Sequence, residues 1–364
     1  MHAPTWRLRG MALALAAALV AACAGDATAP RTVAQPENPP ASTPIAAPTP
    51  DPSPAPNPAV TAYANPVHAG DFPDPFVLRT ERFYYAYATN VGGANVPAMR
   101  SVDLVHWDQI GDVMPSLPGW AAANRGLTWA PAAVEVDGQY VLFYTARDSQ
   151  KGLQCLGRAV ASSPAGPFVD NSTQPFLCQD SLGGSIDPEV FKDADGSLYL
   201  IWKNDGNCCR MQVSLWSQRL SPDASTLVGQ PAELVRRDQG WEGPLIEGPS
   251  MWQANGRYFL LYSANWYDSD RYAVGYALCD TPAGPCRKPQ DGPILRTAAG
   301  AAGPGGETFF TDTNGSVWIA YHAWSQPAVG YASGGARSLR LDRVSFEGDQ
   351  VVIRGPSTTQ QPLN

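Results

Sequence analysis

The stretch YVLFYTAR (Tyr140–Arg147) shows the pattern that decides the fold. It is rich in β-branched and aromatic residues and comes after the turn sequence VDGQ, which is typical of a β-strand entered through a tight turn. Four similar runs occur elsewhere in the chain: FYYAYATN (Phe83–Asn90), LYLIWKND (Leu198–Asp205), YFLLYSAN (Tyr258–Asn265) and VWIAYHAW (Val317–Trp324). No segment after Tyr63 has a sustained helical period, so the chain is predicted to be all-β.

The five runs recur at a nearly constant spacing. Tyr84 and Tyr140 are 56 residues apart, and the next three steps are 59, 59 and 60 residues. A fixed period indicates a repeat architecture, and this unit is long enough for a four-stranded antiparallel blade. Radial repetition around a central channel protects the strand edges of β-propellers. We therefore predict one five-bladed β-propeller over residues 61–364, with a two-sheet sandwich as the alternative.

The N-terminus has the features of a processing segment. Two arginines precede an apolar run (Met11–Ala22) that is shorter than the roughly 20 residues needed to span a bilayer. The run ends in LVAAC (Leu19–Cys23), which resembles the lipobox of bacterial lipoproteins, where cleavage leaves Cys23 as the lipidated first residue. We expect residues 1–23 to be a lipoprotein-type signal peptide and the chain to be an exported cell-envelope lipoprotein. A plain secretory signal is the alternative.

The composition of the remaining chain separates a spacer from a folded domain. Residues 24–60 contain eleven prolines among 37 positions, which predicts a disordered Pro/Ala-rich linker. In the whole chain 44% of residues are hydrophobic, enough for a sizeable core, and the net charge of −8 argues against a nucleic-acid partner. The sequence also holds eleven Trp and fourteen Tyr. Some of these aromatic side chains could present flat surfaces to sugars.

Export would permit disulfides. Six cysteines remain once Cys23 is set aside: Cys155, Cys178, Cys208, Cys209, Cys279 and Cys286. Fifteen pairings are possible. Short sequence separation favours joining the first two and the last two, which leaves the adjacent middle two as a vicinal disulfide or as free thiols. A metal site is not predicted there, because no Cys-x-x-Cys motif or histidine cluster accompanies them.

Acidic residues recur at one place in three of the units. Asp74 lies in PDP, Asp187 in IDPEVF and Glu247 in IEGPSM, each at a proline- or glycine-marked entry to an innermost strand. Innermost strands line the channel of a propeller, so we expect the three carboxylates to converge at one channel mouth. Repulsion and burial would raise the pKa of at least one of them. Glycoside hydrolysis needs such a set, with one carboxylic acid and one carboxylate.

The motifs NPVHAGDFPDPFVLR, GGSIDPEVF, LIEGPSMW and AYHAW resemble those of glycoside hydrolase family 43. The resemblance covers about Asn65 to Val352 and implies a five-bladed propeller that hydrolyses arabinan, arabinoxylan or xylo-oligosaccharides with inversion. It assigns Asp74 as the general base, Glu247 as the general acid and Asp187 as the residue that tunes and orients the acid. Inversion implies that the carboxyls of the base and the acid lie roughly 6.5–9.5 Å apart. Asp71 is then expected to anchor its turn.

Five further residues are predicted to bind the substrate or to line the pocket: Phe72, Trp129, Asn204, His322 and Arg337. Trp129 lies in TWAP at the channel mouth, where it could stack on a sugar or simply pack. Arg337 matches an arginine that the family places near the substrate, with an ordinary surface arginine as the alternative. Many members have a histidine in a GPGH motif that in some supports calcium. This chain has GPGG, with Gly305 and Gly306, which disfavours calcium without excluding it, and we expect no required cofactor.

The stretches WKNDGNCC, GPGG and SANWYDSDRYAVGYALC (Ser263–Cys279) are most similar to those of the exo-acting α-1,5-L-arabinofuranosidases in the family. The resemblance implies an enzyme that releases L-arabinose from α-1,5-linked arabinan or arabino-oligosaccharides. We expect a monomer whose partners are plant cell-wall arabinan or arabinoxylan oligosaccharides. A β-xylosidase or an endo-arabinanase of the same family is the alternative. A non-catalytic glycan-binding lipoprotein is a more remote one.

Overall fold

The computed structural model describes residues 60–123, 127–298 and 300–363, which belong to one compact unit, Pro56–Asn364. The predicted signal peptide (1–23), its Cys23 and all but the last residue of the predicted linker (24–60) lie outside the described residues. Within the described part of the chain, no helix is long and apolar enough to cross a membrane.

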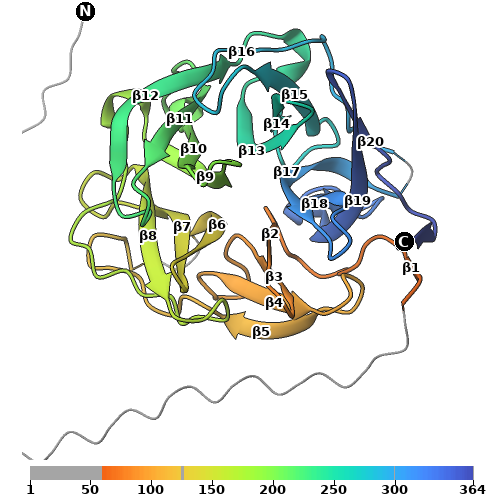
Figure 1. Ribbon diagram of the computed structural model, residues 1–364, viewed down its shortest axis with the longest axis horizontal. Coiled ribbons are helices and arrows are strands. Elements are labelled where there is room, and N and C mark those ends of the chain that lie inside the picture. Colours follow the sequence, from red (N-terminus) through yellow and green to blue (C-terminus); the bar gives the residue numbers. More distant parts are fainter. Residues whose placement is uncertain (1–59, 124–126, 299, 364) are drawn as a thin grey trace, which may run out of the picture. The chain divides into compact units, whose positions relative to one another are not determined.

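Five antiparallel sheets surround a central axis as the blades of a propeller (Figure 1). The innermost strands are β2 (Phe76–Arg79), β6 (Trp129–Val136), β9 (Ser185–Lys192), β13 (Ile246–Ala254) and β17 (Ala302–Thr311). The second strands, which contain the repeated aromatic runs, are β3 (Tyr84–Tyr87), β7 (Gln139–Arg147), β10 (Leu198–Asn204), β14 (Arg257–Ala264) and β18 (Val317–Trp324). The predicted all-β, five-bladed propeller is confirmed.

The outer strands complete the blades. The third strands are β4 (Pro97–Ser101), β8 (Gln154–Ala161), β11 (Ser214–Leu220), β15 (Ala273–Cys279) and β19 (Arg337–Glu347). The fourth strands are β5 (Asp108–Asp112), β12 (Leu227–Arg236), β16 (Cys286–Arg287) and β20 (Gln350–Ile353). Among the described residues, blade 2 has three strands, and the isolated antiparallel bridges Leu156–Leu177 and Val160–Val169 occupy the place of the fourth. Four short 3₁₀ helices lie in loops: η1 (Asp180–Leu182), η2 (Gly206–Cys209), η3 (Gly240–Glu242) and η4 (Tyr331–Ser333).

Each blade has a distortion at the same place on the channel side. In blades 2 to 5 the register between the first and second strands shifts near the start of the innermost strand, as at a β-bulge. One residue there has a left-handed backbone in every blade: Asp74 (φ 50°), Ala130 (φ 41°), Asp187 (φ 55°), Gly248 (φ 56°) and Gly306 (φ 59°). Glu247 therefore lies one position before the place that Asp74 and Asp187 share, which corrects the prediction that all three occupy the same place.

Apolar side chains pack between blades, because each strand directs alternate residues to its two faces. One cluster joins blades 1 and 5 through Val77, Tyr84, Phe310, Trp318 and Leu339. Separate clusters join blades 3 and 4 and blades 4 and 5, while the largest spans blades 1 to 3. The blades are thus held by face-to-face contacts that leave their channel ends free for polar residues.

The ring is closed by the segment that leads into blade 1, which first runs along blade 5. β1 (Ala62–Tyr63) pairs with β21 (Gln361–Pro362). The Val67 and Phe72 N–H groups then donate to carbonyls of β19. Between β1 and Val67, the buried Asn65 side chain donates from Nδ2 to Leu341 O at 2.7 Å and to Ser357 Oγ at 2.9 Å. Its Oδ1 accepts from Leu341 N at 2.9 Å.

We expect Asn65→Ala to lower the free energy of unfolding by about 2–3 kcal/mol, because it leaves buried backbone groups without partners. Urea denaturation followed by tryptophan fluorescence measures this. Asn171→Ala, at an exposed position, is the matched control and should change the free energy of unfolding by less than about 0.5 kcal/mol. Equal effects of the two substitutions would show that Asn65 does not hold the closure.

Two carboxyls are buried in the channel. Glu307 on β17 accepts a hydrogen bond from Ser263 Oγ at 2.5 Å, and Glu189 on β9 accepts one from Ser250 Oγ at 3.4 Å. Burial raises the pKa of Glu307 to about 8 from its usual 4.5 and raises that of Glu189 well above its usual value. Both groups therefore bind a proton more tightly in the folded state than in the unfolded chain.

A folded-state pKa above the unfolded one means that the stability contributed by Glu307 is present at low pH and is lost as pH rises through about 8. Between pH 5 and pH 8 the wild type should therefore lose unfolding free energy relative to Glu307→Gln, which stays neutral throughout. Denaturation curves at several pH values test this, with the exposed Glu135→Gln as control. A constant difference between wild type and Glu307→Gln across this range would contradict it.

Candidate active site

A cavity of about 690 Å³ opens at one end of the channel and is lined by residues of all five blades. Asp74, Asp187 and Glu247 all line it, so the carboxylates that are distant in sequence meet as expected. Trp129 and Arg337 also line it, as predicted. Each carboxylate comes from the start of, or just before, an innermost strand, where the shared distortion turns it toward the cavity.

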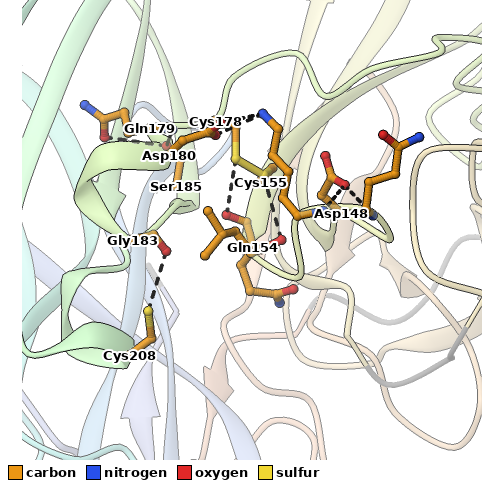
Figure 2. Close-up of a disulfide and its surroundings, with 12 residues drawn as sticks. Asp148, Gln154, Cys155, Cys178, Gln179, Asp180, Gly183, Ser185 and Cys208 are labelled. Carbon is orange, nitrogen blue, oxygen red and sulfur yellow. Dashed lines mark hydrogen bonds and ion pairs between the residues drawn. A yellow bond between two sulfur atoms is a disulfide. The ribbon is translucent and has the colours of Figure 1, made fainter.

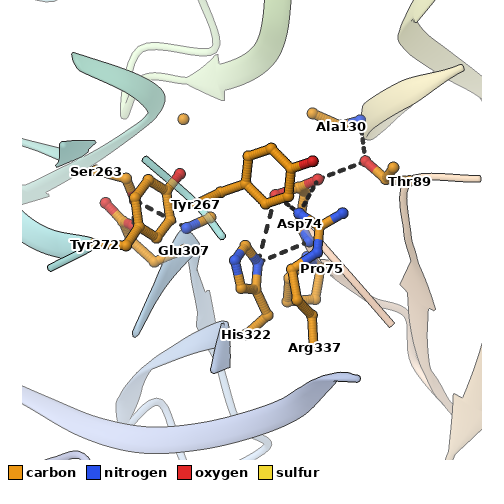
Figure 3. A network of polar contacts seen from close by, with 12 residues as sticks. Asp74, Pro75, Thr89, Ala130, Ser263, Tyr267, Tyr272, Glu307, His322 and Arg337 are labelled. Carbon is orange, nitrogen blue, oxygen red and sulfur yellow. Dashed lines mark hydrogen bonds and ion pairs between the residues drawn. The ribbon is translucent and has the colours of Figure 1, made fainter. Parts of the chain in front are cut away.

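Hydrogen bonds between neighbouring blades fix these distortions. The second strand of each blade, or in blade 1 the residue two positions beyond it, has a polar side chain at one register position: Thr89, Thr145, Lys203, Ser263 and His322. In four of the five steps this side chain accepts a hydrogen bond from the N–H of the left-handed residue of the next blade: Ala130 N to Thr89 Oγ1 (2.8 Å), Asp187 N to Thr145 Oγ1 (3.1 Å), Gly306 N to Ser263 Oγ (2.8 Å) and Asp74 N to His322 Nδ1 (3.1 Å). Figure 3 shows the part of this ring around Asp74.

The step from blade 3 to blade 4 is the exception. Lys203 stands at the ring position but has no acceptor atom. The Gly248 N–H donates instead to Asp187 Oδ2 at 3.1 Å. Lys203 Nζ is left to bind Glu247 Oε2 at 2.9 Å. The lysine at this position, where the other blades have a hydrogen-bond acceptor, thus brings Asp187, Lys203 and Glu247 together.

Asp74 has three polar neighbours (Figure 3). Thr89 Oγ1 donates to its Oδ2 at 2.6 Å, and Arg337 Nη1 lies 3.4 Å from both of its oxygens. His322 Nδ1 accepts from the Asp74 N–H, so its ring proton is on Nε2. Burial, with the nearby Arg337 charge, lowers the pKa of His322 well below its usual value. Asp74 thus lies between a neutral histidine beneath it and an arginine that pairs with its carboxylate.

Asp187 and Glu247 lie in a different electrostatic environment. Burial, the charge of Glu247 and that of Asp74 raise the pKa of Asp187 to about 8, although Lys203 opposes the shift. Burial disfavours the charge on Lys203, but Glu247, Asp187 and Asp205 outweigh burial and raise its pKa. Glu247 also accepts a hydrogen bond from Tyr272 OH at 2.9 Å. With its pKa raised to about 8, Asp187 retains its proton near neutral pH.

Aromatic residues from blades 4 and 5 form a wall next to Asp74. The Arg337 guanidinium lies 4.7 Å from the ring centre of Tyr267 and 5.5 Å from that of Tyr331, whose OH accepts from Arg337 Nε at 3.0 Å. Asp71 accepts from the Arg337 N–H at 2.8 Å and from Tyr331 OH at 3.1 Å. Asp71 thus anchors the wall, as its expected turn-anchoring role requires.

Three of the predicted substrate-binding residues lie elsewhere. Phe72 is buried in the apolar cluster between blades 1 and 5 and does not line the cavity. Asn204 is also buried, and its side chain bonds the backbone of Leu182, Gln212 and Ser214. His322 is buried beneath Asp74 and is not among the lining residues. These three predictions are corrected: Phe72 packs, Asn204 braces a loop and His322 positions Asp74.

The structure joins all six remaining cysteines, as Cys155–Cys178, Cys208–Cys209 and Cys279–Cys286. Short sequence separation favours the first and the last of these pairings, and of the two alternatives left open for Cys208 and Cys209 the structure has the vicinal disulfide. Figure 2 shows Cys155–Cys178 and, on the other side of Gly183, Cys208. Cys208 also lines the cavity.

Lys203, Tyr272 and Thr89 bind the carboxylates directly but were not singled out from the sequence. Lys203 and Thr89 had a visible signal, because each is the polar residue that ends a repeated apolar run. Tyr272 had none, since it lies in a loop and reaches Glu247 only through the fold. Its ring stacks on that of His322 with centroids 5.7 Å apart.

The residues present do not fit a protein-bound calcium ion. Gly305 and Gly306 supply no side-chain ligand, and a Cβ on Gly306 would lie 2.7 Å from Asp74 Oδ1 and from His322 Nδ1. Across the described ranges, no cluster of three or more His, Cys, Asp or Glu side chains could hold a metal. We assign no catalytic step to a metal, and the expectation that none is required stays a prediction.

Known proteins share this architecture and these motifs. A thermostable family-43 glycoside hydrolase of known structure is 30% identical, with a TM-score of 0.74, and the match covers 82% of this chain and 98% of that one. A xylosidase/arabinosidase from Butyrivibrio fibrisolvens is 29% identical over 55% of this chain, and a β-D-galactofuranosidase from Aspergillus niger is 25% identical over 72% of it.

The matches span 38% of the length of the first of these two relatives and 76% of the second. They span about half the length of two β-xylosidases from Xylanibacter ruminicola. The sequence profile of the glycosyl hydrolases family 43 matches residues 63–352, which is most of the chain and all five blades. The chain belongs to glycoside hydrolase family 43.

Proposed function

We propose that this glycoside hydrolase is an inverting, exo-acting enzyme that releases L-arabinose from α-1,5-linked arabinan and arabino-oligosaccharides. The observation that carries the proposal is the division of one cavity into two environments. Asp74 lies beside an arginine and a threonine, while Glu247 pairs with Lys203 next to Asp187, whose pKa is raised to about 8. An inverting hydrolase needs such a base and such an acid on opposite sides of the scissile bond.

On one side of the bond, Asp74 acts as the general base. It takes a proton from a water molecule while the water oxygen attacks the anomeric carbon. Thr89 and His322 fix the position of Asp74, because one donates to its carboxylate and the other accepts from its N–H. Arg337 pairs with Asp74 and, as a pocket-lining residue, can also donate to sugar hydroxyls.

On the other side, Glu247 gives its proton to the leaving oxygen as the glycosidic bond breaks. Both Glu247 oxygens accept hydrogen bonds, from Lys203 and Tyr272, and near neutral pH a proton rests on Asp187. A substrate oxygen that draws the Lys203 ammonium away from Glu247 shifts this proton to Glu247. Asp187 then acts as the tuning and orienting residue that the family resemblance implies.

The exo action and the sugar rest on different supports. The wall of Tyr267, Tyr331 and Arg337 stands at the Asp74 side of the cavity, where an exo-acting enzyme needs one end closed. Arabinose rests on the similarity of the WKNDGNCC and Ser263–Cys279 stretches to exo-acting arabinofuranosidases. A β-xylosidase is the second candidate, because relatives named as xylosidases match this chain. An endo-arabinanase is named among the relatives as well.

Removing the acid should affect substrates according to their leaving groups. We expect Glu247→Ala to lower kcat on linear arabinan by about 10²–10⁴-fold, the usual contribution of a general acid. Activity on 4-nitrophenyl α-L-arabinofuranoside should fall far less, because nitrophenolate leaves without a proton. Steady-state kinetics on both substrates check this, with the exposed Glu347→Ala as control. Full activity of Glu247→Ala on arabinan would remove Glu247 from the acid role.

Product analysis tests the proposed function as a whole. Linear 1,5-arabinan should yield arabinose alone from the first time point, and xylo-oligosaccharides should yield little xylose. Proton NMR of the first product should show the inverted anomer. A ladder of arabino-oligosaccharides would indicate endo action, and release of xylose alone would indicate the xylosidase. Retention of configuration would exclude the single-displacement mechanism.

A further inference from the structure

The Cys208–Cys209 disulfide is a feature that the proposed reaction does not use. It joins neighbouring residues in η2, the turn between β10 and β11. Both cysteines are exposed, and Cys208 lines the active-site cavity with Asp205 and Asn207. A disulfide therefore forms part of the cavity surface.

Stability does not account for this bridge. A disulfide stabilises a protein mainly by closing a loop in the unfolded chain, and the effect grows with loop length. Cys155–Cys178 spans 23 residues and Cys279–Cys286 spans seven, but Cys208–Cys209 spans one. The vicinal bridge closes no loop. Its local effect is to hold two sulfur atoms side by side at the cavity rim.

The fold keeps this turn in place from below. Asn204 Nδ2 donates to Leu182 O, at the end of η1, at 3.1 Å and to Gln212 O, between η2 and β11, at 2.9 Å. The Asp205 N–H donates to Gly184 O at 3.1 Å. The Cys208 Sγ lies 3.6 Å from Gly183 O, in the loop that Cys178 ties to Cys155 (Figure 2). The disulfide is thus a braced surface and not the tip of a free loop.

The position of the turn indicates which part of a substrate it would meet. The η2 turn starts three residues after Lys203, whose ammonium binds the proposed acid Glu247. Asp74, the proposed base, belongs to blade 1 and is walled by Tyr267 and Tyr331 from blades 4 and 5. The attacking water and the leaving group are on opposite faces of the cleaved sugar. The blade 3 side of the cavity is therefore the leaving-group side.

We propose that the Cys208–Cys209 disulfide is a binding surface for the sugar residue on the leaving-group side of the scissile bond. The proposal rests on the proposed function and adds to it a residue pair that sets how firmly an oligosaccharide is held. Sulfur is polarisable and the bridge has no charge. It can therefore contact the C–H face of a sugar ring by dispersion, as aromatic rings do elsewhere in sugar sites.

The test compares two substrates that differ only beyond the scissile bond. α-1,5-Arabinobiose has a sugar on the leaving-group side, and methyl α-L-arabinofuranoside has only a methoxy group there. We expect Cys208→Ala/Cys209→Ala to lower kcat/KM on arabinobiose about tenfold, equivalent to about 1.4 kcal/mol. On the methyl glycoside kcat/KM should stay within about twofold of the wild type. The Tm should be unchanged, since the bridge closes no loop.

Cys279→Ala/Cys286→Ala is the matched control, because this bridge joins β15 to β16 and neither cysteine lines the cavity. It should leave the ratio of the two kcat/KM values unchanged. Mild reduction of the native enzyme and alkylation with iodoacetamide, located by peptide mass mapping, gives a second route that needs no variant. Modification of Cys208 and Cys209 should lower activity on arabinobiose selectively.

Equal losses on both substrates, or an unchanged value on arabinobiose, would overturn this role of the disulfide. The two proposals fail in different ways. A wild type that cleaves neither arabinoside removes the proposed function and this inference with it. A wild type that cleaves both, with a double variant that does the same, removes the inference alone.

Discussion

The site depends on one backbone constraint that is repeated around the channel. Each innermost strand bends at a residue with left-handed backbone, and the N–H of that residue faces the neighbouring blade. A buried N–H needs an acceptor, and the preceding blade supplies it through Thr89, Thr145, Ser263 or His322. The bend directs the side chain at that position, or at the one before it, into the cavity. These hydrogen bonds between neighbouring blades therefore also set the direction of the carboxylate side chains.

Lys203 interrupts this ring, and the interruption distinguishes the two halves of the site. A lysine cannot accept, so Asp187 takes over as the acceptor for Gly248 N–H, and the ammonium turns to Glu247. Asp74 keeps the regular arrangement, with neutral His322 below and Thr89 beside it. Three acidic residues from similar strand positions thus lie in different electrostatic environments because their neighbours differ. Asp187 shows this most clearly, since its pKa is raised to about 8.

The sequence was sufficient for the fold and for the identity of the carboxylates. The repeat period and the strand pattern can be read from the sequence, because aromatic runs such as Tyr140–Arg147 must form the buried second strands of the blades. The exact register between strands could not be read from the sequence. Glu247 lies one residue away from the expected position because a bulge shifts the pairing there. Phe72 and Asn204 were misassigned for another reason. Sequence proximity to a catalytic residue does not tell which way a side chain points, and both point into the protein.

The way the ring closes has a consequence for how the enzyme would lose activity. Blades 1 and 5 share no strand, and they meet where Thr308 Oγ1 donates to Pro75 O at 2.9 Å and where His322 and Arg337 contact Asp74. The contact between blades 1 and 5 that closes the ring of blades therefore includes the proposed base, Asp74. If the two ends of the propeller part even slightly, Asp74 loses its alignment while every blade is still folded. Catalytic turnover then indicates whether the ring of blades is closed.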